Sequence, residues 1–387
     1  MTFKSKRNNK FIYFKKIDKI SRVRETLSRY KKIRLDKNER PTDFESYFIN
    51  KIKKKINSDY LNTYPEVEPL YKIFSKKFHL HKEMFVLTAG SDMAIRNCFE
   101  LLVRSGDTII TIFPTYGMVD VYAKLFEANQ VKIHFNKKLE LDTNKLIEAI
   151  NHKTKLIIIA NPNSPTGTII ENKQIVNILK KAKKFNCYVL IDEAYYGFYN
   201  ITVMSYLRKF PNLIIARTFS KAYGLAGCRV GLIIANKTIA KRLYKFRPMY
   251  EINSISVLII KEIMKNKSVV KKHIQETIKG KKYLVKNLNK IGLSYYNSYT
   301  NFLLVDFGTK DLKMKVWNYL IKRNILAVLI RSILPRIRSH NILFERADCV
   351  IRVSEGNYWW SRICAPQPSV LQKSSKGCIL GASAIDR

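Results

Sequence analysis

The sequence predicts an α/β layer fold with a mostly parallel sheet and a second, smaller lobe. Short β-rich apolar runs alternate with helix-length segments from about residue 85 onward. Several of these runs are uninterrupted, which is typical of strands buried on both faces. The chain has 387 residues, and single cores stop growing at roughly 250 to 300 residues. We therefore expect one large core and a smaller one.

The candidate strands of the sheet are seven apolar runs. They are FVLTAG (85–90), DTIITIFP (107–114), VKIHF (131–135), KLIIIAN (155–161), YVLIDEAY (188–195), LIIARTFS (213–220) and GLIIAN (231–236). In open α/β sheets, ligands bind at the C-terminal ends of the strands. The polar residues that follow each run are therefore the candidates for a site.

The second lobe is expected to combine the two ends of the chain. IQETIKGKKYLVKNLNKIG is predicted to be a helix and YTNFLLVDF a strand. We assign residues 1–50 to an N-terminal segment that joins the small domain, 51–265 to the large domain and 266–387 to the small domain. The tail from about residue 357 is atypical, since it contains two adjacent Trp and no amphipathic helix.

The net charge of +41 is the one unusual feature of the composition. Lys and Arg bind phosphates, so such a charge can indicate a nucleic-acid partner. The excess is spread along the whole chain, however, and does not form one arm or stripe. We expect a solvated basic surface that attracts anionic substrates, and no nucleic-acid partner.

Six cysteines lie at positions 98, 187, 228, 349, 364 and 378. None forms a CxxC pair or has a His at metal-ligand spacing, so we expect neither a metal site nor a disulfide framework. The basic start lacks the apolar run of a secretory signal, and no stretch reaches about 18 apolar residues. The expected location is the cytoplasm, with no membrane association.

The segment RTFSKAYGLAGCRVG (217–231) carries the strongest chemical signal. A Lys at the mouth of a sheet and close to an Arg has a lowered pKa, which makes its neutral amine available to a carbonyl. Lys221, with Arg229 eight positions later, fits that description. Lys221 could therefore hold an aldehyde cofactor.

This segment resembles the Schiff-base region of the fold-type I aminotransferases that depend on pyridoxal 5′-phosphate (PLP), and most closely the histidinol-phosphate aminotransferase group. Further motifs similar to those of the family follow in order: LDKNERP (35–41), YP (64–65), AGSD (89–92), FPTYGM (113–118), NPNSPTG (161–167) and DEAYYGF (192–198). The resemblance implies the three-layer PLP-dependent transferase fold, with a mostly parallel seven-stranded sheet and a smaller α+β domain.

The resemblance also implies roles around the cofactor ring. Lys221 would form the Schiff base, and Asp192 would pair with the pyridinium nitrogen and keep it protonated. Tyr195 would bond the ring oxygen, and Tyr116 would stack on the ring. The alternatives are that Asp192 only caps a turn and that the two tyrosines only pack in a core.

For the cofactor phosphate, the resemblance implies a cup of donors at a helix N-terminus. Its members are Gly90, Ser91 and Asp92, with Thr218, Ser220 and Arg229 as further donors. Tyr64 of a second subunit would close the site, which implies a homodimer. Taken alone, GSD is a common helix cap.

Two parts of the chain depart from the family pattern. The Asn that bonds the cofactor ring oxygen in the family is Ser164 here, with Asn163 as a possible substitute. On the substrate side, Asn38 belongs to the N-terminal motif, and Arg352 in CVIRVSEG would clamp the substrate carboxylate. Arg331, from the long basic segment before it, is the candidate for the side-chain or phosphate contact.

The predicted reaction is transamination between a small-molecule amino donor and a 2-oxo acid, by resemblance histidinol phosphate and 2-oxoglutarate in histidine biosynthesis. Alternatives with the same motifs are a PLP-dependent decarboxylase of a phosphorylated amino acid and an aromatic aminotransferase. Alternatives from other classes are a non-catalytic basic homologue that binds nucleic acid and a non-functional chain with a damaged C-terminus.

Overall fold

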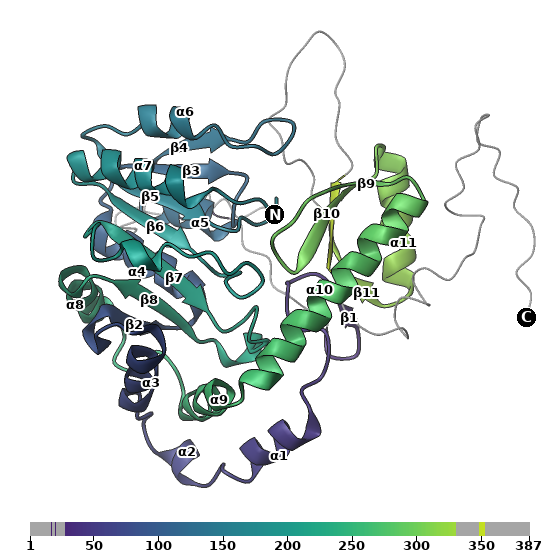
Figure 1. Cartoon of the computed structure of the whole chain (residues 1–387), viewed down its shortest axis with the longest axis horizontal. Coiled ribbons are helices and arrows are strands. Elements are labelled where there is room, and N and C mark those ends of the chain that lie inside the picture. The colour runs from purple at the N-terminus through teal and green to yellow at the C-terminus, as the bar shows by residue number, and fades with distance from the viewer. Residues whose placement is uncertain (1–16, 18–19, 21–27, 330–347, 353–387) are drawn as a thin grey trace, which may run out of the picture.

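A seven-stranded sheet forms the centre of the computed structural model, which describes residues 17, 20, 28–329 and 348–352. Its spatial order is β2-β8-β7-β6-β5-β3-β4 (Figure 1). The strands are β2 (Phe85–Thr88), β3 (Thr108–Phe113), β4 (Asn129–His134), β5 (Thr154–Ala160), β6 (Tyr188–Asp192), β7 (Leu213–Thr218) and β8 (Gly231–Ala235). Each of the seven predicted runs supplies one strand, and the predicted fold class is confirmed.

One strand of this sheet runs against the others. β8 is antiparallel to both of its neighbours, β2 and β7, whereas the remaining pairs are parallel. In this register Gly231, the first residue of β8, lies opposite Thr88 and Thr218, the last residues of β2 and β7. The start of β8 therefore lies at the same sheet edge as the C-terminal ends of the other strands.

Helices cover both faces of the sheet because its strand residues alternate between two cores. Ile157 and Ile159 belong to the core that also contains residues of α3, α7 and α9, and Leu156 and Ile158 to the core that contains residues of α4, α5 and α8. Full burial of such a side chain stabilises the fold by roughly 1.5 to 3 kcal/mol. The helices are α1 (Ser46–Lys53), α2 (Asp59–Asn62), α3 (Glu68–Phe78), α4 (Gly90–Leu102), α5 (Met118–Leu125), α6 (Thr143–Glu148), α7 (Asn172–Lys184), α8 (Lys237–Phe246), α9 (Ser254–Lys265), α10 (Lys267–Lys290) and α11 (Lys310–Lys322).

β4 differs from the expectation of strands buried on both faces. It pairs only with β3 at the edge of the sheet, and Ile133 is its one buried residue. With a single neighbouring strand, β4 leaves one of its hydrogen-bonding edges open to solvent. Charged and polar side chains such as Lys132 and His134 are compatible with such an edge.

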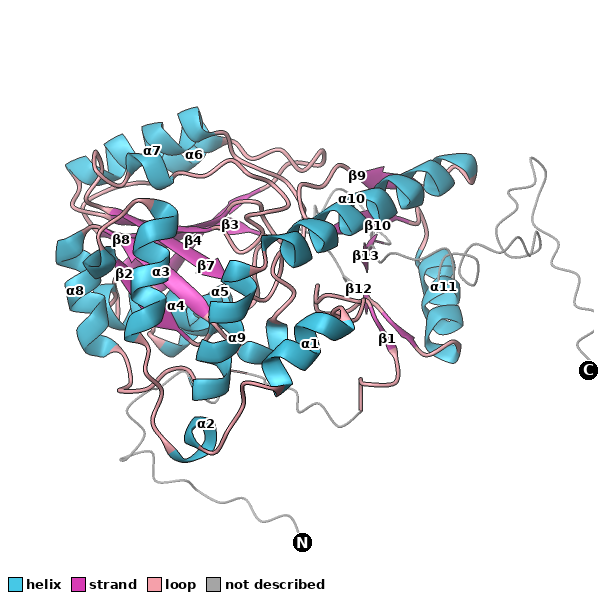
Figure 2. Ribbon diagram, turned by 60° about the horizontal axis from the view of Figure 1, so that its bottom comes forward, coloured by secondary structure: helices cyan, strands magenta, loops and turns pink. Residues whose placement is uncertain are grey.

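The smaller lobe contains a four-stranded antiparallel sheet of order β12-β13-β10-β9. Its strands are β9 (Ser294–Tyr296), β10 (Phe302–Asp306), β12 (Val328–Leu329) and β13 (Asp348–Arg352), and a parallel pair, β1 (Ile33–Arg34) with β11 (Ile325–Leu326), lies beside it. The long helix α10 extends from the large lobe along this sheet (Figure 2). The predicted helix near 274–292 and the strand in YTNFLLVDF are both present. The domain boundaries stay a prediction, and the one at 50/51 falls inside α1.

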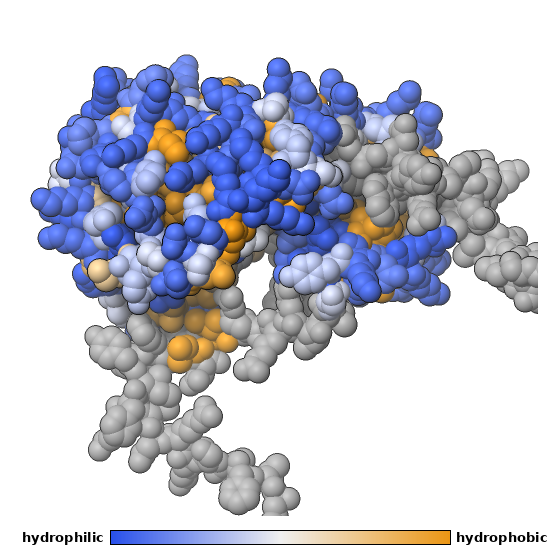
Figure 3. Space-filling view, turned by 90° about the horizontal axis from the view of Figure 1, so that it is seen from below, coloured by the Kyte–Doolittle hydropathy of each residue, from blue (hydrophilic) through white to orange (hydrophobic). Residues whose placement is uncertain are grey.

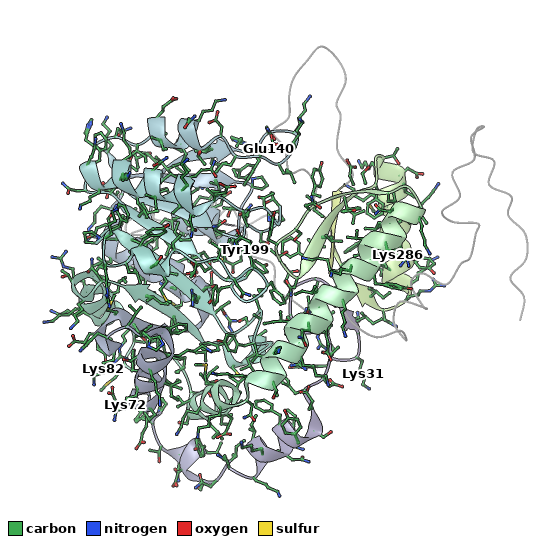
Figure 4. All side chains as sticks on the ribbon, viewed as in Figure 1. Lys31, Lys72, Lys82, Glu140, Tyr199 and Lys286 are labelled. Carbon is green, nitrogen blue, oxygen red and sulfur yellow. The ribbon has the colours of Figure 1, made fainter. Side chains whose placement is uncertain are left out.

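The joint between the lobes involves the NPNSPTG loop and the turn before β10. The Tyr299 amide donates to the Gly167 carbonyl at 2.8 Å, and the Tyr299 ring contacts the Tyr199 ring edge to face at 5.0 Å. Tyr199 lies between the two lobes, whereas Lys286 projects from the outer side of α10 (Figure 4). The Lys281 ammonium donates to the carbonyls of Ser298 and Thr300. Burial lowers the Lys281 pKa to about 8.

Three cysteines whose side chains are described are free thiols: Cys98, Cys187 and Cys228. Burial raises their pKa values to about 12, 12 and 11. No cluster of three His, Cys, Asp or Glu suited to a metal ion occurs in this part of the chain. No helix within it has the length and apolar composition needed to span a membrane.

Candidate functional site

A cleft of about 1280 Å³ opens at the sheet edge where the parallel strands end. Ala160 ends β5, Asp192 ends β6 and Thr218 ends β7, and all three line this cleft. The antiparallel direction of β8 adds Arg229, two residues before that strand begins. Eleven predicted site residues line it: Asn38, Ser91, Asp92, Tyr116, Ser164, Asp192, Tyr195, Thr218, Ser220, Lys221 and Arg229.

The N-terminus of α4 and the Arg229 side chain form an anion-binding corner of the cleft. Gly90 is the first residue of α4 and has a φ of +82°, and a Cβ at this position would lie 2.7 Å from Arg229 Nη2. A Cβ on Gly231 would lie 2.4 Å from the Gly90 carbonyl carbon. Both positions therefore require glycine. The result is a guanidinium group held beside the positive end of a helix dipole, which suits a phosphate.

Two hydroxyl groups extend this corner. The Thr218 hydroxyl lies 2.9 Å from the Ser220 hydroxyl and accepts a hydrogen bond from the Ser220 amide. Arg229 Nη1 lies 3.5 Å from the Ser220 Oγ, and Arg229 Nη2 donates to the Ala89 carbonyl at 3.2 Å. These contacts fix the donors in position before an anion arrives.

Asp192 is a nearly buried carboxylate at the floor of the cleft. Its Oδ1 accepts a hydrogen bond from the Ala194 amide at 3.0 Å. Burial raises the Asp192 pKa to about 7, although that bond and the charge of Lys221 act in the opposite direction. A cation or a protonated ring nitrogen placed beside Asp192 would favour its ionised form.

Lys221 and Tyr195 are neighbours on one side of the cleft. The Lys221 Nζ lies 5.8 Å from the centre of the Tyr195 ring and donates to the Lys37 carbonyl at 2.8 Å. The Asn38 amide nitrogen donates to the Tyr195 hydroxyl at 2.8 Å. The N-terminal motif and the lysine segment, almost 200 positions apart in the sequence, thus meet at the same point.

Tyr116 lies across the cleft and carries a hydroxyl 3.4 Å from the Asp92 carboxylate. Burial raises the Tyr116 pKa, and the negative charge of Asp92 adds to this effect. The phenol therefore stays protonated at neutral pH. Its ring is 39% exposed in the open cleft, so it is available to stack on a bound ring.

Ser164 lines the cleft, whereas Asn163 does not. The Asn163 side chain is 1% exposed and is engaged in internal hydrogen bonds. Its amide nitrogen donates to the Pro114 carbonyl and the Thr166 hydroxyl, and its oxygen accepts from the Thr115 hydroxyl. Asn163 therefore shapes the loop from inside, and only Ser164 presents a side chain to the cleft.

Besides Asn163, the described part of this chain does not bring Tyr64, Arg352 or Arg331 into the cleft. Tyr64 is 73% exposed and stacks on the Tyr250 ring at 4.3 Å. Arg352 ends β13 opposite Phe302, whose ring contacts Tyr195, but its side chain lies outside the described residues. Arg331 lies outside them entirely.

The sequence reasoning did not find a buried ion pair beneath the site. Arg217, the residue before Thr218, donates to the Glu193 carboxylate at 2.7 Å, and both side chains are almost fully buried. The Thr202 hydroxyl also bonds Glu193. Because Glu193 directly follows Asp192, this pair anchors the end of β6. The signal available in the sequence was that Arg217 and Glu193 carry opposite charges and lie directly beside Thr218 and Asp192, which end two predicted strands.

The comparisons with known proteins agree with this geometry. A family model described as Aminotransferase class I and II matches residues 30–338. A histidinol-phosphate aminotransferase of Caldanaerobacter subterraneus subsp. tengcongensis is 33% identical over 299 residues, covering 76% of this chain and 83% of the relative. The enzyme of the same name from Sulfurisphaera tokodaii is 34% identical over 285 residues, covering 70% and 77%.

Solved structures show the same fold. Histidinol-phosphate aminotransferase from Sinorhizobium meliloti, in complex with pyridoxal-5′-phosphate, has a TM-score of 0.76 and 21% identity and covers 87% of this chain and 90% of its own. Aspartate aminotransferase from Thermus thermophilus with maleate has a TM-score of 0.70 and 16% identity, with coverages of 84% and 88%. From the matched family model and these relatives, the chain belongs to the class I and II aminotransferases and is a PLP-dependent transaminase.

Proposed function

We propose that this transaminase moves the amino group of histidinol phosphate, or of a closely similar amino-alcohol phosphate, to a 2-oxo acid. The observation that carries the proposal is the one-third identity to relatives named for this reaction over about three quarters of the chain. Lys37 also lines the cleft and adds a positive charge that suits an anionic substrate, whereas the neighbouring Arg29 and Arg34 are paired with Asp36 and Glu39.

The residues present fit PLP. A carboxylate with a raised pKa lies at the floor of the cleft, an amine lies near it, and a corner with a guanidinium, two hydroxyls and a helix N-terminus suits a phosphate group. We assign Asp192 to the ring nitrogen, Lys221 to the aldehyde carbon, and Ser91, Ser220 and Arg229 to the phosphate. Bound PLP supplies a carbonyl that takes up the amino group and a ring that accepts electrons from the substrate Cα.

Each side chain has a separate task in this proposal. Asp192, once ionised, holds a proton on the ring nitrogen, and Tyr195 directs its hydroxyl at the ring oxygen. The Lys221 amine would take a proton from the substrate Cα and deliver it to the former aldehyde carbon of the cofactor. Tyr116 covers one face of the ring and excludes water from it.

The assay should separate amino transfer from decarboxylation. Purified protein loaded with PLP is given histidinol phosphate with 2-oxoglutarate, and glutamate is measured. Glutamate formation at a rate well above that with tyrosine or phenylalanine as donor supports the proposal. Carbon dioxide release from O-phosphothreonine without glutamate formation from any donor would contradict it.

We also propose a cytoplasmic homodimer in which Tyr64 contributes to the site of the second subunit. Hydrophobic side chains are exposed around this residue: Leu61 is 76% and Met249 76% exposed. The face seen from below shows hydrophobic residues among hydrophilic ones (Figure 3). Such exposed groups are typical of an interface.

A subunit-mixing experiment tests the dimer. Lys221→Ala and Tyr64→Ala proteins, each nearly inactive alone, are unfolded, mixed and refolded. A shared site predicts that mixed dimers regain part of the wild-type rate, because one of their two sites is intact. If mixing restores nothing while sedimentation shows mixed dimers, Tyr64 does not act across the interface.

A further inference from the structure

Arg29 is the centre of an ion network in the N-terminal segment. Its Nε donates to Asp36 Oδ2 at 3.1 Å, and its Nη1 donates to Glu39 Oε1 at 3.0 Å. Arg34 Nε lies 3.3 Å from Glu39 Oε2. The four side chains, Arg29, Arg34, Asp36 and Glu39, are between 18% and 28% exposed and are called the Arg29 network below. Partly buried charge-assisted bonds of this kind also fix geometry.

The network closes a tight turn of the chain. Asp36 and Glu39 flank Lys37 and Asn38, and both carboxylates hold the same guanidinium. Asn38 has a φ of +52°, a left-handed conformation that Asn adopts more readily than most residues with a side chain. The Arg29 guanidinium holds the two carboxylates on either side of this residue and so ties both ends of the turn together.

The turn presents two groups to the cleft. The Lys37 carbonyl accepts from the Lys221 amine, and the Asn38 amide nitrogen donates to the Tyr195 hydroxyl, both at 2.8 Å. The Asn301 amide nitrogen, 3.4 Å from the Asn38 carbonyl, ties the same turn to the small lobe. Displacement of the turn would therefore move a partner of Lys221 and a partner of Tyr195 together.

The direction of the Asn38 bond matters for Tyr195. Because the amide donates to the phenol oxygen, the Tyr195 hydroxyl proton is directed at a different acceptor. Ser164 occupies the position where the resembling motif has Asn, and its hydroxyl has a shorter reach. A firmly oriented Tyr195 is then the more important donor to the ring oxygen of PLP.

We propose that the Arg29 network is a positioning device that holds Asn38 on Tyr195 and the Lys37 carbonyl on Lys221, and so orients the Tyr195 proton toward the cofactor. The proposal rests on the cofactor site proposed above and is independent of the substrate. Burial lowers the Arg29 pKa, but the bonds to Asp36 and Glu39 outweigh it and raise that pKa. Arg29 therefore stays charged throughout a pH titration.

The test compares Arg29→Gln, Arg29→Lys and Asn38→Asp with a control, Arg96→Gln, which removes an exposed Arg–Glu100 pair on α4. The absorption band of bound PLP is titrated with pH. We expect Arg29→Gln and Asn38→Asp to shift the apparent pKa of the band by about one unit and to lower kcat ~10-fold with little change in KM. The carboxylate that Asn38→Asp introduces accepts the Tyr195 proton, whereas the native amide donates to the phenol oxygen.

Hydrogen exchange gives a second readout that needs no activity. The Leu35 amide beside this turn donates to the Leu326 carbonyl at 2.7 Å, and it should exchange ~10-fold faster in apo Arg29→Gln, with a partial return in Arg29→Lys and no change in the control. The inference is wrong if Arg29→Gln titrates and exchanges like the wild type. It is also wrong if this variant only lowers the melting temperature, as a surface pair would. A wild-type protein with no PLP band would refute the cofactor site instead.

Discussion

The proposed cofactor side and the proposed substrate side of the cleft are built differently. Asp192, Thr218 and Arg229 lie at the ends of adjacent strands in one sheet, and α4 starts at the same edge. The other side is formed by the N-terminal turn, whose Asn38 reaches Tyr195, and by Val328 of β12 in the small lobe. The first side is fixed by the core of the sheet, whereas the second depends on contacts between segments that are distant in the chain.

This difference has a physical consequence. β6 and β7 each pair with two neighbouring strands along most of their length, so their end positions vary little. The turn at Asn38 depends on side-chain ion pairs and on a few hydrogen bonds. Substitutions at the strand ends should therefore change the chemistry or the affinity for the cofactor. Substitutions at the Asn38 turn should change the orientation of neighbouring groups.

The largest effect is expected from Lys221→Ala. The change removes the amine that bonds the aldehyde carbon and moves the proton, so kcat should fall by at least ~10³-fold. The PLP absorption band that borohydride abolishes in the wild type should be missing. Wild-type-like reduction by borohydride in Lys221→Ala would show that another lysine holds the cofactor, and Lys37, the other lysine among the described residues that line the cleft, is the alternative to test.

Asp192→Asn should have the next largest effect, on both rate and pH dependence. The folded-state pKa of Asp192 is about 7, above its ordinary value of 3.8. The folded apoprotein thus binds more protons than the unfolded chain between these values, and its stability should fall as pH rises from about 4 to 7. The loss is on the order of 4 kcal/mol.

Urea unfolding of the apoprotein at several pH values measures this effect. In Asp192→Asn, the free energy of unfolding should no longer fall between pH 4 and 7 through this group. Asp311→Asn, at an exposed pair with Lys315, should show the same fall as the wild type. An unchanged pH dependence in Asp192→Asn would mean that a different group titrates. With PLP bound, kcat should fall ~10²-fold, because the ring nitrogen loses its counter-charge.

Gly90→Ala tests the phosphate corner, with Gly106→Ala as a matched control. Both residues have a positive φ, of +82° and +87°, so each substitution strains the backbone equally. Only at Gly90 does the added carbon meet Arg229, whereas nothing lies within 4 Å at Gly106. We expect the PLP dissociation constant to rise ~10-fold in Gly90→Ala alone. Equal affinity in both variants would place the phosphate elsewhere.

The smallest effect is expected at Lys281, in the joint between the two lobes. The folded-state pKa of Lys281 is about 8, below its ordinary 10.5. The unfolded chain then binds more protons between these values, so wild-type stability should rise with pH over that window, by roughly 1 to 3 kcal/mol. Lys281→Met should lack this rise in urea unfolding, whereas the neighbouring exposed Lys282→Met should retain it.

The sequence predicted the cofactor side more completely than the substrate side. Asp192 and Thr218 each end an apolar run, and the ends of parallel strands meet at one edge whatever the rest of the chain does. The contact between Asn38 and Tyr195 has no such local signal, because it joins residues 157 positions apart. The antiparallel direction of β8, which brings in Arg229, could not be read from an apolar run either.

The Arg29 network illustrates the same limit. The run RLDKNER contains opposite charges at short spacing, but a solvated segment has such a composition too. Only the fold shows that Asp36 and Glu39 converge on one guanidinium. Asn163 shows the reverse case, since a residue inside a recognised motif supports the loop without facing the cleft.

The three shielded thiols make the protein a convenient reporter. Cys98, Cys187 and Cys228 stay protonated in neutral buffer, because burial raises their pKa values to about 11 or 12. A thiol must ionise before it reacts with a maleimide or a disulfide reagent. These three thiols should therefore react slowly in the native protein and quickly after unfolding. The rate at which they are labelled would then report how often the large lobe opens.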